Sequence, residues 1–186
     1  NVRISDSAVT PTAYAERAKQ FGLGILSSAE HGWQGNYYET YRIAKEYGLK
    51  PLIGAEAYWV KDRLEKDRSN CHIFIGARNE NGRQALNDVL SEANLTGFYG
   101  QPRLDIPLIL SLPPKDVIVT TACIAYWRYD DIEDITKEFH KHFGKNFFLE
   151  VQYHNTDSQR ELNKRILRLH EELKIPLIVG CESHYM

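Results

Sequence analysis

The sequence lacks several features that would assign it to common classes of protein. Among its 186 residues, no apolar run reaches the roughly 20 residues that a membrane-spanning helix needs. The first residues form no signal-peptide pattern. Neither of the glycine-rich motifs that bind nucleotide phosphates, GxGxxG and GxxxxGK(S/T), is present. These absences argue against a membrane protein and against a nucleotide-binding loop of either type.

Cysteine and excess charge are also scarce. The three cysteines, Cys71, Cys123 and Cys181, show no CxxC spacing, which favours buried thiols or metal ligands in a reducing compartment such as the cytoplasm. Lys and Arg number 23 against 25 Asp and Glu, so the net charge is −2. Domains whose main function is to bind nucleic acid usually carry a basic face. The charge balance therefore argues against a nucleic-acid-binding domain, although this domain could still be attached to a larger DNA-binding chain.

What is present suits one packed domain. Hydrophobic residues make up 42% of the chain and aromatic residues 11%, which is enough for a sizeable core. The length fits one domain better than two. Because the chain begins with Asn1 and not with Met, we expect residues 1–186 to be a fragment of a longer protein.

Apolar runs alternate with amphipathic segments, and this pattern predicts a repeated β-α order. Thr10 followed by Pro11 is typical of a helix start. A polar, hairpin-like insertion is predicted at 61–70. The Pro-rich segment 97–114 is the longest predicted loop, with one helical turn predicted near 106–110. Predicted strands cover 23–29, 51–60, 72–77, 117–122, 147–153 and 176–181, and predicted helices cover 11–21, 35–47, 81–93, 131–143 and 156–173.

The predicted strands are almost wholly apolar, as are the strands of a parallel sheet covered by helices. Six such strands, with at least one more expected upstream, favour a closed barrel over an open doubly wound sheet. In barrels of this kind the chemistry lies on the loops that follow the carboxyl ends of the strands. The residues at those ends are therefore the candidates for a functional site.

Ligand-type side chains lie at five of these strand ends. Histidine, carboxylate and occasional cysteine ligands at one end of a barrel are typical of multinuclear zinc, manganese or iron sites. Carboxylates offset the repulsion between neighbouring divalent ions, and such a site suits phosphoester hydrolysis. The residues are Glu30, His31, Glu56, Cys123, His154, Glu182 and His184.

Each of these residues also has a plainer interpretation. His31 fits an ordinary loop histidine, Cys123 a small buried hydrophobe, and the pair Glu182 and His184 an ordinary loop. Glu56 is the strongest candidate ligand, because a lone carboxylate in an apolar strand is costly unless it is paired or bound to metal.

Several segments together resemble the PHP (polymerase and histidinol phosphatase) domain family over nearly the whole chain. Glu30 and Glu182 stand where the family usually has aspartate. Two segments, Lys50–Glu56 and Gly97–Asp105, resemble the branch found in bacterial DNA polymerase III alpha subunits. The other segments that carry the resemblance are Ser28–Gly32, His72–Gly82, Ala122–Ile124 and Gly180–Tyr185.

This resemblance implies a TIM-like, distorted (β/α)7 barrel that holds up to three divalent zinc, manganese or iron ions. It implies catalytic roles for His31, Glu56 and His184, and Arg103 and His154 are candidates for contact with a substrate phosphate. The implied metal ligands are Asp6, His31, Glu56, His72, Cys123, Glu182 and His184. The ligand role of His72 is implied by the resemblance alone, because His72 begins its predicted strand and does not end it.

The family's first motif, His-x-His, would precede Asn1, so we expect that motif and the first strand to be missing from this chain. The implied activity is that of a metal-dependent phosphoesterase in DNA replication, a proofreading exonuclease that trims a DNA 3′ end beside polymerase core domains. Two alternatives are a catalytically silent PHP module that braces a polymerase and a free-standing PHP phosphatase. Metal binding would distinguish the silent module, and a polymerase domain after Met186 would exclude the free-standing enzyme.

Overall fold

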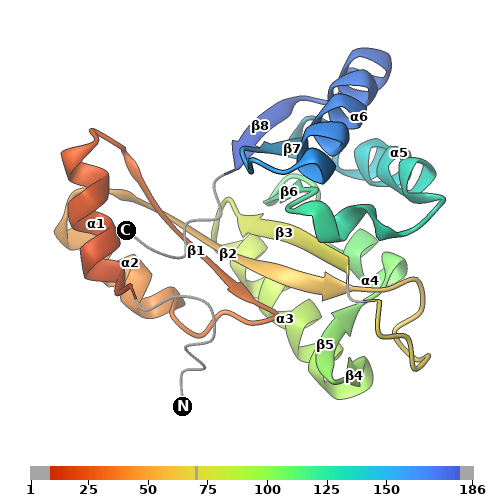
Figure 1. Cartoon of the computed structure of the whole chain (residues 1–186). Helices are drawn as coiled ribbons and strands as arrows, with labels where there is room; N and C mark the ends of the chain where they lie inside the picture. Colours follow the sequence, from red (N-terminus) through yellow and green to blue (C-terminus); the bar gives the residue numbers. More distant parts are fainter. Residues whose placement is uncertain (1–8, 70, 181–186) are drawn as a thin grey trace.

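The computed structural model describes residues 9–69 and 71–180, which form a curled, mixed β-sheet with helices packed against it (Figure 1). The helices are α1 (Pro11–Gln20), α2 (Tyr37–Glu46), α3 (Glu80–Thr96), α4 (Ile106–Leu110), α5 (Ile132–Phe143) and α6 (Asp157–Leu173), with short 3-10 helices η1 (Ile124–Arg128) and η2 (Gly144–Asn146). The strands are β1 (Ile25–His31), β2 (Lys50–Trp59), β3 (Cys71–Ala77), β4 (Phe98–Tyr99), β5 (Gln101–Leu104), β6 (Val117–Thr120), β7 (Phe147–Gln152) and β8 (Leu177–Gly180).

Side-chain caps fix the start of four helices. Thr10 Oγ1 accepts a hydrogen bond of 3.3 Å from a backbone N–H in the first turn of α1, and Pro11 takes the first helical position, as the sequence predicts. Asn79, Asp105 and Thr156 do the same for α3, α4 and α6. These oxygens satisfy N–H groups that have no partner within the helix.

The long strand β2 organises the sheet. Its residues Lys50 to Glu56 pair in parallel with β1, and its last two residues, Tyr58 and Trp59, pair in parallel with β5. The full order is β4-β5-β2-β3-β6-β7-β8, with β1 also on β2. β6, β7 and β8 are parallel neighbours, but β3 runs antiparallel to both β2 and β6. The prediction of a wholly parallel sheet is therefore wrong at β3.

The segment between β2 and β3 explains this reversal. A parallel neighbour needs a crossover of about a dozen residues, usually a helix, and the segment 60–69 contains none. Asx turns at Asp62 and Asp67 hold it as a compact loop instead. The chain re-enters the sheet at the end where β2 leaves it. The start of β3, including His72, therefore lies where β1 and β2 end.

The predicted loop 97–114 contains more structure than its sequence indicates. Tyr99 and Gln101 pair across Gly100, whose φ of +77° suits glycine, and form the small β4–β5 hairpin. β5 then pairs with the end of β2, and α4 follows. The helical turn predicted near 106–110 is confirmed as α4. The strands β4 and β5 have only two and four residues, so hydrophobic periodicity could not predict them.

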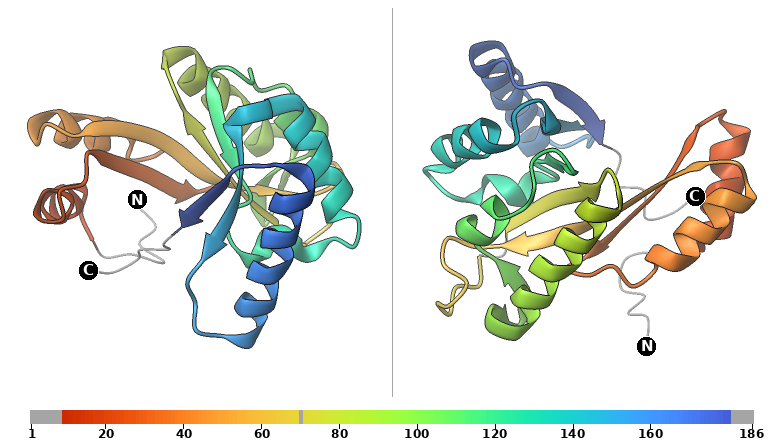
Figure 2. Two further views of the ribbon diagram at one scale, coloured as in Figure 1. Left: turned by 90° about the horizontal axis from the view of Figure 1, so that it is seen from above. Right: turned by 180° about the vertical axis from the view of Figure 1, so that it is seen from behind.

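Two hydrophobic clusters among the described residues hold the helices against the sheet. Figure 2 shows that the helices they join, α1 and α2 in red and orange and the helices in green to blue, form two separate groups. The larger joins α3, α4, α5 and α6 to β2, β3, β6 and β7, and the smaller joins α1 and α2 to β1. Strand alternation separates the two faces of β2: Ala55, Ala57 and Trp59 are fully buried in the larger cluster, while Glu56 and Tyr58 are half-buried on the opposite, concave face. The concave face carries the candidate site.

The predicted barrel is confirmed as far as a curled, half-barrel α/β sheet. Within residues 9–69 and 71–180, β1 and β8 each pair with a single strand and not with each other. Of the helices in these two ranges, none has the length and apolar character needed to cross a membrane.

Candidate metal centre

Strand register brings His31, Glu56 and His72 together on the concave face. His31, the last residue of β1, lies directly beside Glu56 of β2. His72 of β3 pairs with Tyr58, two residues beyond Glu56. Directly paired residues, and residues two apart in one strand, point to the same face. The antiparallel course of β3 is what gives His72 this position near the start of its strand.

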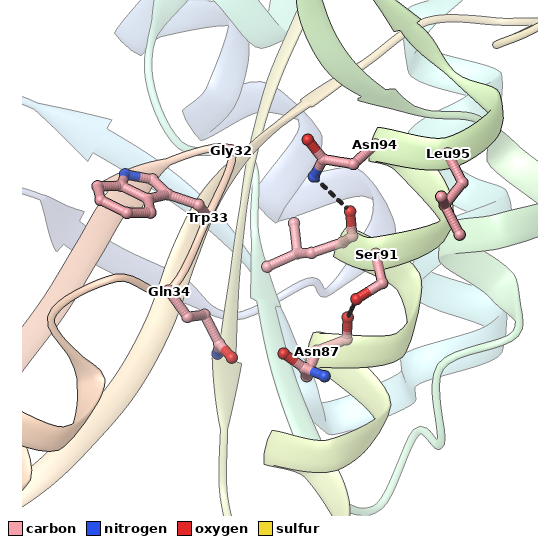
Figure 3. Close-up of a pocket in the computed structure, with 8 residues that line it drawn as sticks. Gly32, Trp33, Gln34, Asn87, Ser91, Asn94 and Leu95 are labelled. Carbon is pink, nitrogen blue, oxygen red and sulfur yellow. Dashed lines mark hydrogen bonds between the residues drawn. The ribbon is translucent and has the colours of Figure 1, made fainter. Parts of the chain in front are cut away.

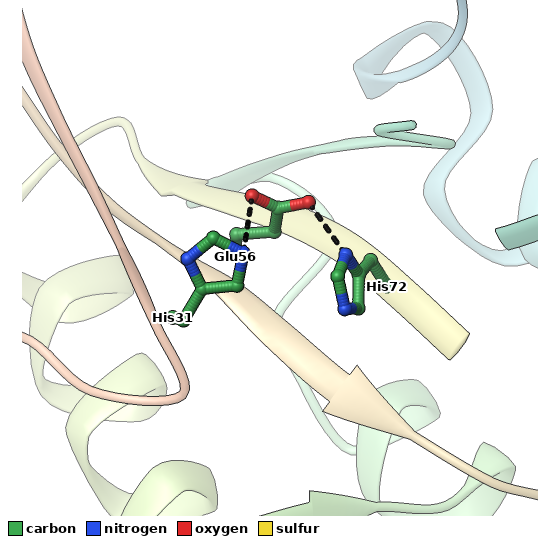
Figure 4. A group of neighbouring side chains, drawn as sticks. All are labelled: His31, Glu56 and His72. Atoms are coloured by element: carbon green, nitrogen blue, oxygen red, sulfur yellow. Dashed lines mark hydrogen bonds and ion pairs between the residues drawn. The ribbon is translucent and has the colours of Figure 1, made fainter. Parts of the chain in front are cut away.

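Glu56 lies between the two imidazoles and directs one oxygen at each (Figure 4). Its Oε1 is 2.9 Å from His72 Nδ1, and its Oε2 is 3.4 Å from His31 Nε2. One ligand atom from each of the three side chains lies within 4.8 Å of the other two. Two imidazole nitrogens and a carboxylate at this spacing match the donor set of zinc, manganese or iron sites.

The surroundings of Glu56 favour its charged form. Only 15% of the Glu56 side chain is exposed, and this burial by itself would raise the pKa. The hydrogen bond from His72, the charges of His31 and His72 and a contact with Cys123 outweigh burial, so the pKa of Glu56 is lowered below its ordinary value. A carboxylate that stays ionised in a half-buried site attracts a cation.

Cys123 adds a sulfur donor beside this cluster. Its Sγ lies 3.3 Å from His72 Nδ1, and the residue is only 8% exposed. After β6 the backbone turns at Ala122, which has a φ of +45° and donates its N–H to Thr120 Oγ1. This turn brings the thiol toward β3. Cys123 is therefore within reach of an ion held by His72.

The remaining predicted ligands, Asp6, Glu182 and His184, lie outside the described residues. Their predicted ligand roles, and the catalytic role of His184, stay predictions.

Glu30 is not part of the cluster, although it precedes His31. Neighbouring residues of a strand point to opposite faces, and Glu30 lies on the face opposite to the imidazole of His31. Burial raises the pKa of Glu30 against the opposing hydrogen bonds from Asn36, and its buried Oε2 has no hydrogen-bond partner among residues 9–69 and 71–180. Glu30 therefore differs from Glu56 in its surroundings and in the direction in which its pKa is shifted.

Arg103 is held in the interior and not at the concave face. The residue is 2% exposed, and its guanidinium donates hydrogen bonds to the backbone carbonyls of Gly97, Arg63 and Asp67. These bonds tie the 61–69 loop to the β4–β5 hairpin. The predicted contact between Arg103 and a substrate phosphate does not fit these surroundings, because the guanidinium is buried and its N–H groups donate to backbone carbonyls.

His154 ends a ladder of polar side chains that begins on the concave face of β6 and β7. Thr120 Oγ1 donates to Glu150 Oε2 at 2.6 Å, and Gln152 Nε2 donates to Glu150 Oε1 at 3.0 Å. His154 Nε2 lies 3.2 Å from Gln152 Oε1, and the residue is exposed. The sequence analysis did not single out Glu150 or Tyr58. Their alternation with buried apolar neighbours along β7 and β2 was the available signal.

A separate pocket of about 380 Å³ lies between the 32–34 segment and the second half of α3 (Figure 3). Its polar lining includes Gln34, Asn87 and Asn94. The pocket does not include His31, Glu56 or His72. It lies on the helix side of the sheet, so it is distinct from the candidate metal centre.

Comparison with known proteins settles the family. The sequence matches the PHP domain over residues 1–154. The chain belongs to the PHP domain family. Among its relatives are DNA polymerase III subunits alpha from Borreliella burgdorferi, 30% identical over 197 aligned residues, and from Aquifex aeolicus, 28% identical over 202. Each alignment covers 98% of this PHP chain and 17% of the polymerase subunit. The chain thus spans about a sixth of the length of these relatives.

Two solved structures share the fold of this PHP domain. One is described as a "putative metal-dependent phosphoesterase" from Bifidobacterium adolescentis, with a TM-score of 0.60 and 18% identity over 98% of this chain and 85% of that one. The other is an amidohydrolase from Chromobacterium violaceum with bound sulfate and no metal, with a TM-score of 0.63 and 16% identity over 98% and 84%. At these identities the likeness shows the fold alone.

Proposed function

We propose that this PHP domain binds divalent metal ions at His31, Glu56 and His72 and hydrolyses phosphoesters. The observation that carries the proposal is the half-buried Glu56 carboxylate, with one oxygen directed at each imidazole on the concave face of the sheet. Metal ligands of these types at this spacing are rarely assembled for packing alone, since burying charge without a strong partner is costly.

Further residues are proposed to complete the cluster and the barrel. Cys123, 3.3 Å from His72, would add a thiolate, and Asp6, Glu182 and His184 would add the ligands that the family resemblance implies. This set would hold up to three zinc, manganese or iron ions. We also propose that the half-barrel is part of a distorted (β/α)7 barrel.

Divalent ions bound there would supply charge stabilisation for a phosphate group and acidify a bound water. His31 and His72 bind as neutral imidazoles, and the negative charge of Glu56 offsets the repulsion between ions. His31, Glu56 and His184 are the residues proposed to carry the reaction. His154, exposed at the end of the polar ladder, is proposed to contact a phosphate oxygen.

The polymerase relatives suggest the setting of this activity. We propose that the domain acts within a replicative DNA polymerase in the cytoplasm and trims a DNA 3′ end as a 3′–5′ exonuclease. The support is the similarity to DNA polymerase III subunits alpha over 98% of the chain. Because the net charge of this chain is −2, we propose that other domains of such a polymerase supply the basic side chains that bind the DNA phosphates.

The test compares the wild-type chain with Glu56→Gln and with the control Glu171→Gln, whose residue is exposed on α6. Metal content is measured by plasma mass spectrometry after purification without chelator. Hydrolysis is measured on bis-p-nitrophenyl phosphate and on a 3′-labelled DNA strand. We expect metal and hydrolysis in the wild type and the control, and a loss of both in Glu56→Gln.

Each alternative has its own signature in this experiment. Wild-type chain that takes up no metal when manganese or zinc is added would refute the proposal and support the silent, bracing module. Hydrolysis of the small phosphoester without any action on DNA would support a free-standing phosphatase. Equal metal content in Glu56→Gln and the wild type would refute the assignment of Glu56.

A further inference from the structure

The rings of His31, Tyr58 and His72 contact one another in a triangle, and Glu56 contacts the two imidazoles. The ring centroid of Tyr58 lies 5.1 Å from that of His72 and 5.8 Å from that of His31. The two imidazole centroids are 5.3 Å apart. Tyr58 meets His72 edge to face, with 75° between the ring planes, and is tilted by 37° against His31. One tyrosine therefore contacts both imidazoles of the proposed centre.

Tyr58 is held in this position by the same strand register as the centre itself. It follows Glu56 by two residues in β2 and pairs directly with His72, so all three side chains share the concave face. The Cδ2–Cε2 edge of its ring packs against Gly32. A β-carbon added to Gly32 would be 3.1 Å from Tyr58 Cδ2. The phenol ring is thus confined between the β1 end and β3.

His72 depends on packing for its orientation. A metal-binding histidine is usually held by a hydrogen bond at its second ring nitrogen, which fixes the plane of the ring. Both hydrogen-bond partners of His72, Glu56 and Cys123, are at Nδ1. Within the part of the chain that the structure describes, His72 Nε2 has no hydrogen-bond partner. The rings of Tyr58 and His31 pack edge to face against the imidazole and restrict its rotation.

We infer that Tyr58 is a positioning residue for the metal centre, which orients His31 and His72 through ring contacts. This inference rests on the proposed metal-binding function. The aromatic ring is the feature that matters, because the contacts with both imidazoles are made by the ring. Tyr58→Phe keeps the ring, and Tyr58→Leu removes it.

The test measures Mn²⁺ and Zn²⁺ binding by titration calorimetry, and the visible absorption of bound Co²⁺, which reports ligand geometry. We expect Tyr58→Leu to raise the Kd roughly 10-fold to 100-fold, as loss of an orienting contact typically does, and to change the Co²⁺ spectrum. Tyr58→Phe should match the wild type in both. Tyr41→Leu, at an exposed tyrosine of α2, should also match it.

Thermal unfolding of the metal-free proteins separates positioning from general stability. If Tyr58→Leu does not fold, Tyr58→Met, which fills the space with a flexible side chain, takes its place. A wild type that binds none of the three ions would refute the metal site itself, and the inference with it. A wild type that binds them and a ringless variant with the same Kd and the same Co²⁺ spectrum would refute only the role of Tyr58.

Discussion

Gly54 of β2 and Gly76 of β3 are direct cross-strand partners, and the ring of Phe74 lies over both of them. A β-carbon on Gly54 would come within 2.6 Å of the Phe74 ring and 2.8 Å of the carbonyl oxygen of Ile75. An aromatic ring that covers glycines in this way compensates for their missing side chains. The pair fixes the spacing of β2 and β3 just below Glu56 and His72.

We predict that Gly54→Ala lowers the free energy of unfolding by about 1–3 kcal/mol, since the new methyl group must push the ring and the β3 backbone away. Metal binding should weaken as well, because Glu56 is two residues from Gly54 and His72 is two residues from Phe74, whose ring the new methyl group would displace. Urea denaturation and metal titration measure the two effects. Gly24→Ala is the matched control: no atom lies within 4 Å of its added β-carbon, so we expect no loss of stability.

Arg103→Met should destabilise the fold and leave the proposed metal site intact. Three backbone carbonyls would lose their charged donor, and bonds to charged groups contribute about 1.5–3 kcal/mol each. We expect a loss of about 3 kcal/mol in urea denaturation, with unchanged metal content in the folded protein. A variant of normal stability with weaker binding of a phosphoester substrate would instead support the substrate contact predicted from sequence.

The described thiols should differ in reactivity. Burial raises the pKa of Cys71 to about 12, so almost none of it is thiolate at pH 8, and the residue is fully buried. We expect N-ethylmaleimide at pH 8 to modify Cys123 slowly and Cys71 not at all in the native protein. Added Zn²⁺ should slow the modification of Cys123 further. Peptide mass mapping measures both, and labelling of Cys123 that zinc does not affect would argue against its ligand role.

Glu133 joins α5 to α6, and this link should depend on pH. Its Oε1 lies 2.7 Å from Arg165 Nε and 2.9 Å from Arg168 Nη2. Burial opposes ionisation, but the two arginines lower the pKa of Glu133 below the ordinary 4.5. A lowered folded-state pKa contributes stability above pH 4.5 that is lost as the pH falls through the folded value.

We therefore expect Glu133→Gln to lower the free energy of unfolding by about 0.5–1 kcal/mol at pH 7, with a smaller difference at pH 3. Urea denaturation at the two pH values measures this. Glu171→Gln, on the exposed side of α6, serves as the control and should show no such pH dependence. An equal difference at both pH values would mean that the carboxylate charge is not what links the helices.

Much of the site could be predicted from residue types at strand ends. His31 ends the apolar strand β1, and Glu56 lies within the apolar strand β2. A carboxylate in an apolar strand indicates a binding partner, which the structure identifies as two imidazoles. His72 could be predicted only from the family resemblance, because its position depends on the direction of β3. The predicted phosphate contact of Arg103 stays a prediction that its bonds to three backbone carbonyls do not favour, since sequence cannot distinguish an arginine that binds phosphate from one that binds backbone carbonyls.

The sequence alone determined the order of the main helices and strands and most of their bounds to within two or three residues, because their periodicity, caps and glycine stops are local properties of the chain. It also determined which residue types were available for a metal centre. Tertiary structure alone decided that β3 runs antiparallel, and so that His72 and Tyr58 share one face with Glu56. Strand direction and register are set by pairing between distant segments and by loop geometry. The hydrophobic pattern of a single segment therefore cannot predict them.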